Sequence, residues 1–156
     1  MNKLSSEKQT QDLTGHLIDF IIATDFGDLP GPVIDHAKQQ ILDTIGVTIG
    51  GSSAKGCKEV IELVKEWDGN KQCTIPVYGG KVPAPLAGLA IGPMTRALDF
   101  GDTCPEAGHV SEYVLPALLP VSELRAVSGK EFITAFVLGC EILIRIGEPA
   151  FTAKPL

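Results

Sequence analysis

The apolar residues of this chain recur at every third or fourth position, and glycine or proline interrupts that pattern several times. Apolar side chains with this spacing share one face of an α-helix, whereas a half-buried strand needs strict alternation of apolar and polar residues. Glycine and proline tend to end helices, so each interruption marks a boundary. The pattern predicts helices over residues 13–26, 32–49, 53–67, 84–97, 111–124 and 128–146.

One segment, residues 70–82, departs from the helical period. Thr74, Ile75, Val77 and Tyr78 favour a short extended piece there, because β-branched and aromatic residues suit a pleated strand. No other segment is dominated by such residues. We therefore expect an all-α bundle of about six helices, with at most a short extended segment near residues 70–82.

The chain has a length of 156 residues, which suits a single domain. Residues 1–10 are polar and are expected to form a disordered lead. Residues 11–156 are expected to form one helical domain.

Short polar motifs predict where several helices begin. Ser52 or Ser53 can cap the third helix, because a serine hydroxyl accepts a hydrogen bond from the free backbone N–H groups of the first turn. Ser111 is placed to cap the fifth helix. Ser128 and Glu131 have the spacing of a capping box at the start of the sixth.

The charge of the chain argues against a nucleic-acid partner. Its net charge is −6, with 19 acidic against 13 basic residues, and no run of lysine or arginine is present. Binding to phosphate backbones requires clustered positive charge. We expect no nucleic-acid partner.

Nothing in the sequence predicts a membrane segment or export. The N-terminal residues lack the apolar core of a signal peptide. The longest apolar stretch, residues 132–146, contains Glu141 and Arg145, and it is shorter than the about 20 apolar residues of a membrane span. We expect a cytoplasmic protein that does not associate with membranes.

Four cysteines, at positions 57, 73, 104 and 140, are too far apart for a zinc knuckle or a redox pair. They are expected to be reduced and to serve as small apolar residues. Asp99, Asp102, Cys104 and His109 match no metal-ligand spacing, so no metal is expected.

His109 is the most informative candidate for chemistry. It precedes the helix predicted from Ser111, where the partial positive charge of the helix N-terminus disfavours a second positive charge. A neutral imidazole there can accept a proton, which suits a general base. The alternative is an ordinary loop histidine.

Asp99 and Asp102 lie at the predicted C-terminal end of the preceding helix, where the helix dipole disfavours carboxylates. Residues that oppose local stability often serve a site. Thr103 follows Asp99 by four residues, and His109 comes within reach of Asp99 if the loop folds back. One loop is thus predicted to gather a carboxylate, a hydroxyl and an imidazole, although a solvated helix end is the alternative.

Residues 97–147 carry a series of motifs in order: Leu98-Asp99-Phe100-Gly101-Asp102-Thr103, His109-Val110-Ser111, Pro116-Ala117-Leu118, Ser128-Gly129, Gly139-Cys140-Glu141 and Arg145-Ile146-Gly147. This order resembles the MmgE/PrpD family of 2-methylcitrate dehydratase-like enzymes. That family shows Leu-Asp-Phe-Asp-Asp-Thr, then His-Pro-Ser, a Pro-Ala-Leu helix, Ser-Gly, and a helix ending Gly-x-Glu…Arg-x-Gly. The earlier Leu42-Asp43-Thr44-Ile45-Gly46 resembles the family's Leu-Asp-x-x-Gly.

The resemblance implies that this chain is the N-terminal part of a helical domain in a lyase-type enzyme. By the same resemblance, Asp99, Thr103 and His109 line an active site that dehydrates, decarboxylates or epimerises small di- or tricarboxylates without an iron–sulfur cluster. We therefore expect no cofactor. Family members are typically homodimers of about three times this length, with a smaller α+β lid.

We assign substrate binding to Arg96, Asp102 and Ser111, beside the catalytic group of Asp99, Thr103 and His109. The sequence departs from the family pattern at four positions. These are Arg96 in place of a common histidine, Gly101 in place of the second aspartate, Pro105 in place of a frequent histidine, and Val110 in place of proline.

The family's second histidine and its substrate-binding lysines come from later helices. A substrate with several carboxylates needs cationic partners. We therefore expect the chain to be inactive alone, and to form a homodimer or to bind a partner chain that carries the missing half. The rival hypothesis is a non-catalytic helical subunit or remnant that binds a partner through uncovered apolar surface.

Overall fold

A computed structural model describes residues 12–152, with side chains up to Glu148, so the predicted disordered lead over residues 1–10 lies outside the described residues. The α-helices are α1 (Leu13–Ala23), α2 (Gly31–Gly51), α3 (Cys57–Trp67), α4 (Ala84–Arg96), α5 (Ser111–Arg125) and α6 (Gly129–Thr152). A 3-10 turn, η1 (Phe26–Asp28), joins α1 to α2. The prediction of an all-α fold is confirmed.

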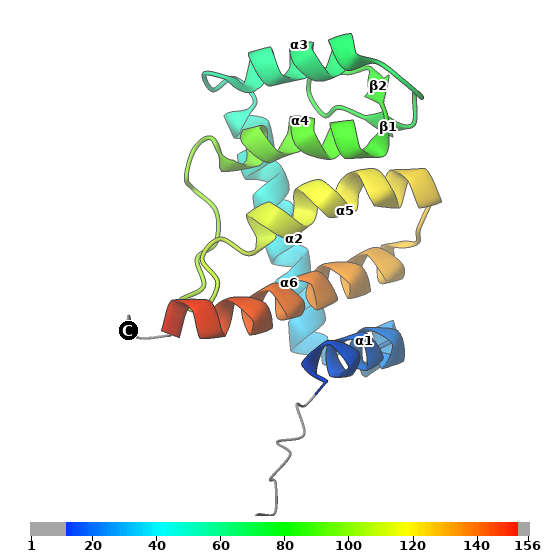
Figure 1. Cartoon of the computed structure of the whole chain (residues 1–156), viewed down its shortest axis with the longest axis vertical. Helices are drawn as coiled ribbons and strands as arrows, with labels where there is room; N and C mark the ends of the chain where they lie inside the picture. Colours follow the sequence, from blue (N-terminus) through cyan, green and yellow to red (C-terminus); the bar gives the residue numbers. More distant parts are fainter. Residues whose placement is uncertain (1–11, 153–156) are drawn as a thin grey trace, which may run out of the picture.

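The predicted extended segment forms a small antiparallel ribbon. Its strands are β1 (Cys73–Thr74) and β2 (Lys81–Val82), and Cys73 pairs with Val82. The ribbon lies beside one end of α4 and α5 (Figure 1). It covers part of the core without adding a second layer.

Helices α3, α4, α5 and α6 are stacked side by side, and α2 runs across the stack (Figure 1). α2 contacts α4, α5 and α6, so it joins helices that are far apart in the sequence. α1 lies at the α6 end of the stack (Figure 1). The two ends of the loop between α4 and α5 are therefore held by neighbouring, well-packed helices.

Two groups of buried side chains form the core. The larger group packs α3 and α4 against the ribbon and includes Ile61, Val64, Ile75 and Met94. The smaller group joins α2, α5 and α6 through Ala37, Leu115 and Phe136. Burying each large side chain of this kind contributes about 1.5–3 kcal/mol.

Small and hydroxyl-bearing residues let α2 approach its neighbours closely. A Cβ atom at Gly51 would overlap the carbonyl oxygen of Met94, so only glycine fits at this crossing with α4. The Thr48 and Thr95 hydroxyls pair at 2.9 Å, also between α2 and α4. One turn earlier on the same face of α2, the buried Thr44 hydroxyl donates to the Ser111 hydroxyl at 2.9 Å.

The capping predictions had mixed outcomes. The capping box is confirmed, because the Ser128 N–H donates to Glu131 at 2.7 Å and the Glu131 N–H donates to the Ser128 hydroxyl at 3.3 Å. The prediction of a cap at Ser52 or Ser53 is wrong. Ser52 instead closes α2, with its hydroxyl donating to Ile49 at 2.7 Å, and α3 follows Gly56, whose φ of 93° favours glycine.

Helix α6 continues past the predicted end at residue 146 and reaches Thr152. On its polar side, the Arg145 guanidinium donates to Glu141 at 2.7 Å, with the spacing of four residues that brings side chains together on a helix. Across residues 12–152, none of the helices combines the length and apolar character needed to cross a membrane.

Glu123, in the last turn of α5, anchors the ribbon. Its carboxylate accepts hydrogen bonds from Lys81 Nζ at 2.8 Å, from the Thr74 N–H at 2.7 Å and from the Thr74 hydroxyl at 2.8 Å. The Lys81 ammonium, followed by the Thr74 N–H, lowers the pKa of the Glu123 carboxyl to about 2. This contact should therefore make stability depend on pH.

We predict that Glu123→Gln lowers the free energy of unfolding at pH 7 by about 1 kcal/mol, a value discounted for solvent screening. The folded pKa is depressed, so the contribution is complete above the unfolded pKa and is lost as pH falls toward about 2. Urea unfolding at several pH values should show the difference between the two proteins closing over that window. Glu66→Gln, at an exposed position of α3, is the control. A stability difference between wild type and Glu123→Gln that does not depend on pH would contradict the assignment.

Candidate active site between α4 and α5

The loop between α4 and α5 begins with an unusual backbone conformation at Asp99. Its φ is 51°, in the left-handed region that aspartate tolerates better than most residues. The Asp99 N–H donates to the Arg96 carbonyl at 3.2 Å, which closes the end of α4. This turn directs the Asp99 carboxylate back to the Arg96 guanidinium, with which it forms a hydrogen-bonded ion pair.

A tight turn later in the loop places His109. Cys104 and Gly108 exchange two backbone hydrogen bonds, each of 2.7 Å, and Gly108 has a φ of 71°. The turn rests on α6, where a Cβ atom at Gly147 would lie 2.8 Å from the Glu106 carbonyl oxygen. Gly108 and Gly147 therefore allow the loop to fold back and to lead into the start of α5.

His109 lies between two carboxylates. Its Nε2 atom is 3.5 Å from Asp99 Oδ1, and its Nδ1 atom is 3.6 Å from Glu112 Oε2. The imidazole side chain is 22% exposed, so solvent or a ligand can reach it. The structure thus brings His109 and Asp99 together across the loop, as expected for a loop that folds back.

Sequence reasoning did not identify Glu112. Its side chain is fully buried in the first turn of α5, and its Oε2 lies 3.4 Å from Arg96 Nη1. Neither carboxylate oxygen has a hydrogen-bond partner within the described part of the chain. The available signal was its spacing of three residues from His109, which places the two side chains on neighbouring parts of the same helix start.

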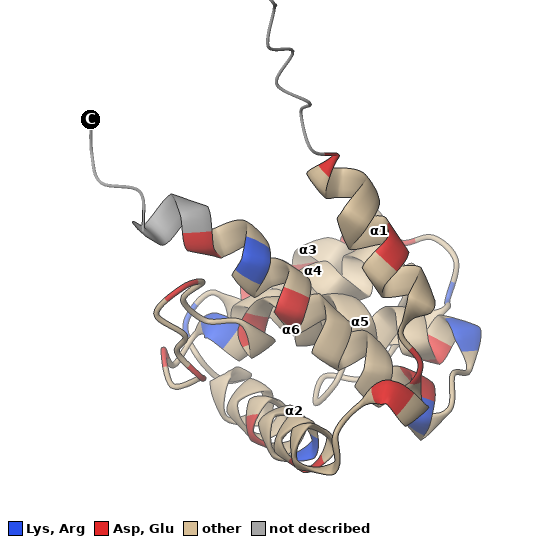
Figure 2. Cartoon of the chain, turned by 90° about the horizontal axis from the view of Figure 1, so that it is seen from below, with Lys and Arg blue, Asp and Glu red and all other residues tan. Residues whose placement is uncertain are grey.

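Arg96 is the centre of charge at this end of the site. Hydrogen bonding to Asp99 and the nearby charge of Glu112 raise the pKa of the arginine, and the same hydrogen bond lowers the pKa of Asp99. Both groups are therefore charged at neutral pH. Figure 2 shows acidic positions recurring along the loop between α4 and α5. Arg96 itself lies beside two carboxylates, those of Asp99 and Glu112.

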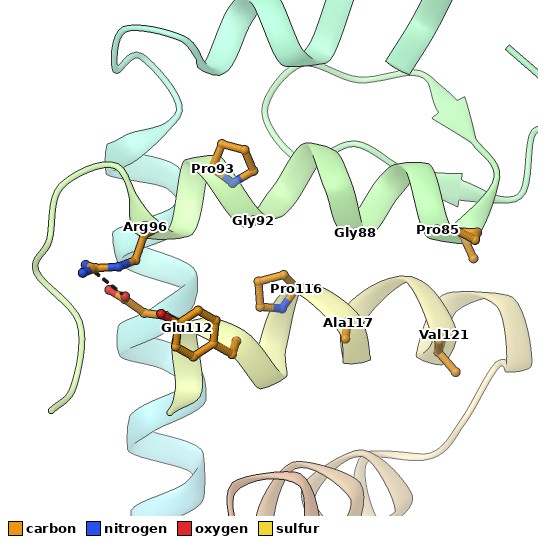
Figure 3. A pocket seen from close by; sticks show the side chains of 11 residues that line it. Pro85, Gly88, Gly92, Pro93, Arg96, Glu112, Pro116, Ala117 and Val121 are labelled. Carbon is orange, nitrogen blue, oxygen red and sulfur yellow. Dashed lines mark ion pairs between the residues drawn. The ribbon is translucent and has the colours of Figure 1, made fainter. Parts of the chain in front are cut away.

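Arg96 and Glu112 close one end of a cavity of about 650 Å³ between α4 and α5. The rest of its wall is mainly apolar, and Gly88 and Gly92 keep the α4 side open, as Figure 3 shows. A Cβ atom at Gly88 would come within 3.2 Å of the Pro116 carbonyl oxygen. The cavity can thus hold a small molecule beside the Arg96–Glu112 pair, with His109 next to that pair.

Asp102, Thr103 and Ser111 line a second cavity, of about 300 Å³, between α2, the loop and α6. The Asp102 carboxylate accepts from the Ser111 N–H at 3.1 Å and also from the Ser111 hydroxyl. The prediction that Ser111 caps α5 is wrong, because Ser111 is the first helical residue and Asp102 satisfies its N–H. Thr103 is exposed and lines this cavity.

The candidate residues therefore fall into two groups. Arg96 and Glu112 line the larger cavity, and Asp99 and His109 lie next to these two residues. Asp102, Thr103 and Ser111 belong to the smaller one. Among residues 12–148, no three histidine, cysteine, aspartate or glutamate side chains are grouped so that they could hold a metal ion.

Comparison with known proteins assigns this arrangement to a family. A family model described as the MmgE/PrpD N-terminal domain matches residues 15–154. The cis-aconitate decarboxylase-like protein oryM of Aspergillus oryzae is 24% identical over 153 residues, which cover 93% of this chain and 32% of the relative.

The cis-aconitate decarboxylase of Mus musculus is 30% identical, over 80% of this chain and 26% of its own length. That of Aspergillus terreus is 29% identical, over 83% of this chain and 27% of its own length. The chain thus spans about a third or less of the length of these curated relatives. Since the family match extends from α1 to the last turn of α6 and beyond, the chain belongs to the MmgE/PrpD family.

Proposed function

We propose that this chain is one segment of a lyase that decarboxylates a small unsaturated tricarboxylate of the cis-aconitate type, with His109 as its proton-transfer group. The placement of His109, within 3.6 Å of two carboxylates and beside the Arg96 end of the larger cavity, is the observation that carries the proposal. The relatives named as cis-aconitate decarboxylases favour this substrate class.

Decarboxylation and dehydration both require a group that transfers a proton. When a carboxylate leaves as carbon dioxide, the electron pair of the broken bond stays on carbon and must receive a proton. When water is eliminated, as in a 2-methylcitrate dehydratase reaction, a proton next to a carboxylate must be removed. A positioned imidazole serves both steps and contributes on the order of 10²–10⁴-fold.

In this proposal Asp99 fixes Arg96 for contact with a substrate carboxylate. Asp102, Thr103 and Ser111 act from the smaller cavity, where they hold the loop or meet a more distant part of the substrate. These roles agree with the family motif and with the separate locations of the two groups.

The charge of the site indicates that this segment needs further cations. Between positions 96 and 112, Arg96 is the only lysine or arginine, against the four carboxylates of Asp99, Asp102, Glu106 and Glu112. A tricarboxylate would be repelled by this arrangement unless additional positive groups approach it. We propose that another polypeptide segment supplies them.

We predict that the 156-residue chain alone converts cis-aconitate or 2-methylcitrate no faster than buffer. Addition of a polypeptide that carries the remaining family segment should restore turnover, measured by product formation. In that reconstituted enzyme His109→Ala should lower kcat by about 10² or more, since it removes proton transfer. Cys57→Ala, far from the site in the α3 core, should leave kcat unchanged.

Two results would contradict this proposal. Full turnover by the chain alone would show that the cations are already present. Reconstituted turnover that His109→Ala leaves intact would show that another group transfers the proton.

A second candidate function rests on exposed apolar surface. The side chains of Ile21, Tyr113 and Ile146 are 42%, 58% and 60% exposed, and they line a nearly apolar groove of about 550 Å³ formed by α1, α5 and α6. Apolar patches of this kind mark sites of protein association. We propose that a partner chain, in the simplest case a second copy, covers this groove whether or not the assembly is catalytic.

We predict self-association of the chain in sedimentation-velocity experiments at micromolar concentration. Ile146→Lys should raise the dissociation constant about tenfold or more, because it buries a charge in the interface. Ile22→Lys is the matched control, since Ile22 is 77% exposed and lies outside the groove. A monomeric wild-type chain, or equal effects of the two substitutions, would count against this surface.

A further inference from the structure

Three buried polar atoms at the site have no hydrogen-bond partner within the described residues: His109 Nδ1, Glu112 Oε1 and Glu112 Oε2. Buried donors and acceptors are almost always hydrogen-bonded, and a buried carboxylate without hydrogen bonds is costly. The Arg96 guanidinium, 3.4 Å from Glu112 Oε2, forms an ion pair with it but no hydrogen bond. The unpaired nitrogen and the unpaired Oε2 are only 3.6 Å apart. A small side-chain adjustment makes them partners, with Nδ1–H as donor and the carboxylate as acceptor.

The Glu112 carboxylate also occupies the space in front of Gly101. A Cβ atom at Gly101 would lie 2.6 Å from the Glu112 Cδ and 2.7 Å from its Cγ, and it would overlap Oε1. Gly101 does not have a positive φ, so the backbone itself would accept another residue. Position 101 is where the family motif carries its second aspartate, so this chain cannot hold both that aspartate and Glu112 in its present place.

We propose that Glu112 is a positioning residue that replaces the missing carboxylate of position 101. It accepts the Nδ1 proton of His109, holds the imidazole beside Arg96, and leaves Nε2 as the atom that exchanges a proton. The inference rests on the proposed function in one respect, because the lyase reaction is what uses the proton exchanged at Nε2. The short distance from His109 to Glu112, and the Glu112 side chain in the space that a Cβ atom at Gly101 would need, do not depend on that function.

The competing acceptor for His109 is Asp99, at 3.5 Å from Nε2. Asp99 is 72% exposed and already pairs with Arg96, whereas Glu112 is fully buried and has no hydrogen bond. A hydrogen bond in the less polar environment is stronger, so Glu112 determines which nitrogen keeps the proton.

The first test records the imidazole ¹⁵N and ¹H correlations of the ¹⁵N-labelled full chain, at a pH where histidines are neutral. His109 should show a protonated Nδ1, while exposed His16 and His36 provide internal references in the same spectrum. Glu112→Met should abolish this preference, and Glu112→Gln, which keeps an acceptor oxygen, should retain it. Glu106→Met, in the same loop, should not alter it.

The second test is a double-mutant cycle on thermal unfolding with Gly101→Ala and Glu112→Ala. Gly101→Ala alone should lower the unfolding temperature by roughly 3–8 °C, as overpacking does in a domain of this size. In the Glu112→Ala background the same change should have almost no effect. If Gly101→Ala alone does not fold, folding should return in the double variant.

A protonated Nε2 in the wild-type chain, or the Nδ1 form persisting in Glu112→Met, would overturn the positioning role. Equal loss of stability from Gly101→Ala in both backgrounds would show that Glu112 does not fill the space needed by a side chain at position 101. Neither measurement uses turnover. Both can therefore be interpreted even if the chain has no part in a lyase, and a negative result for Glu112 does not change the outcome of the activity assay.

Discussion

The close crossing of α2 and α4 is the contact on which the candidate site depends. Gly51 allows the α4 backbone at Met94 to approach α2, and the Thr48–Thr95 hydroxyl pair holds that crossing in register. One turn earlier on the same face of α2, the Thr44–Ser111 pair fixes the start of α5. Because α2 holds both helices, the last turn of α4 meets the first turn of α5, and Arg96 and Glu112 come within 3.4 Å. Bulkier residues at these contacts would separate the two halves of the site.

Negative charge predominates around His109. His109 is enclosed by Asp99 and Glu112, and Arg96 compensates only part of their charge. Such a group can hold and direct a proton, but it does not by itself attract a polyanion. The chain belongs to the MmgE/PrpD family and spans about a third or less of the length of its curated relatives.

Much of this arrangement was predictable from the sequence, and the remainder depended on packing. The helical period gave every helix, because that signal is local, and the Ser128–Glu131 capping box was read correctly. The start of α3 was missed because Gly56, not Ser52, sets the turn. The convergence of Asp99 and His109 followed from the loop, but the position of Thr103 on the smaller cavity did not, because that cavity forms only where the loop packs beside α2 and α6. Glu112 was overlooked because its burial is visible only in three dimensions.

We propose that this chain holds the proton-transfer residues of a lyase site without the cations that bind its substrate. Titration of the chain with cis-aconitate, followed through the NMR signals of His109, tests it directly. We expect no saturable change with a dissociation constant below about 1 mM, so any binding should be weaker than about 4 kcal/mol. Saturable binding at micromolar concentration, lost in Arg96→Ala, would contradict it by showing that the charge-binding half of the site is already complete.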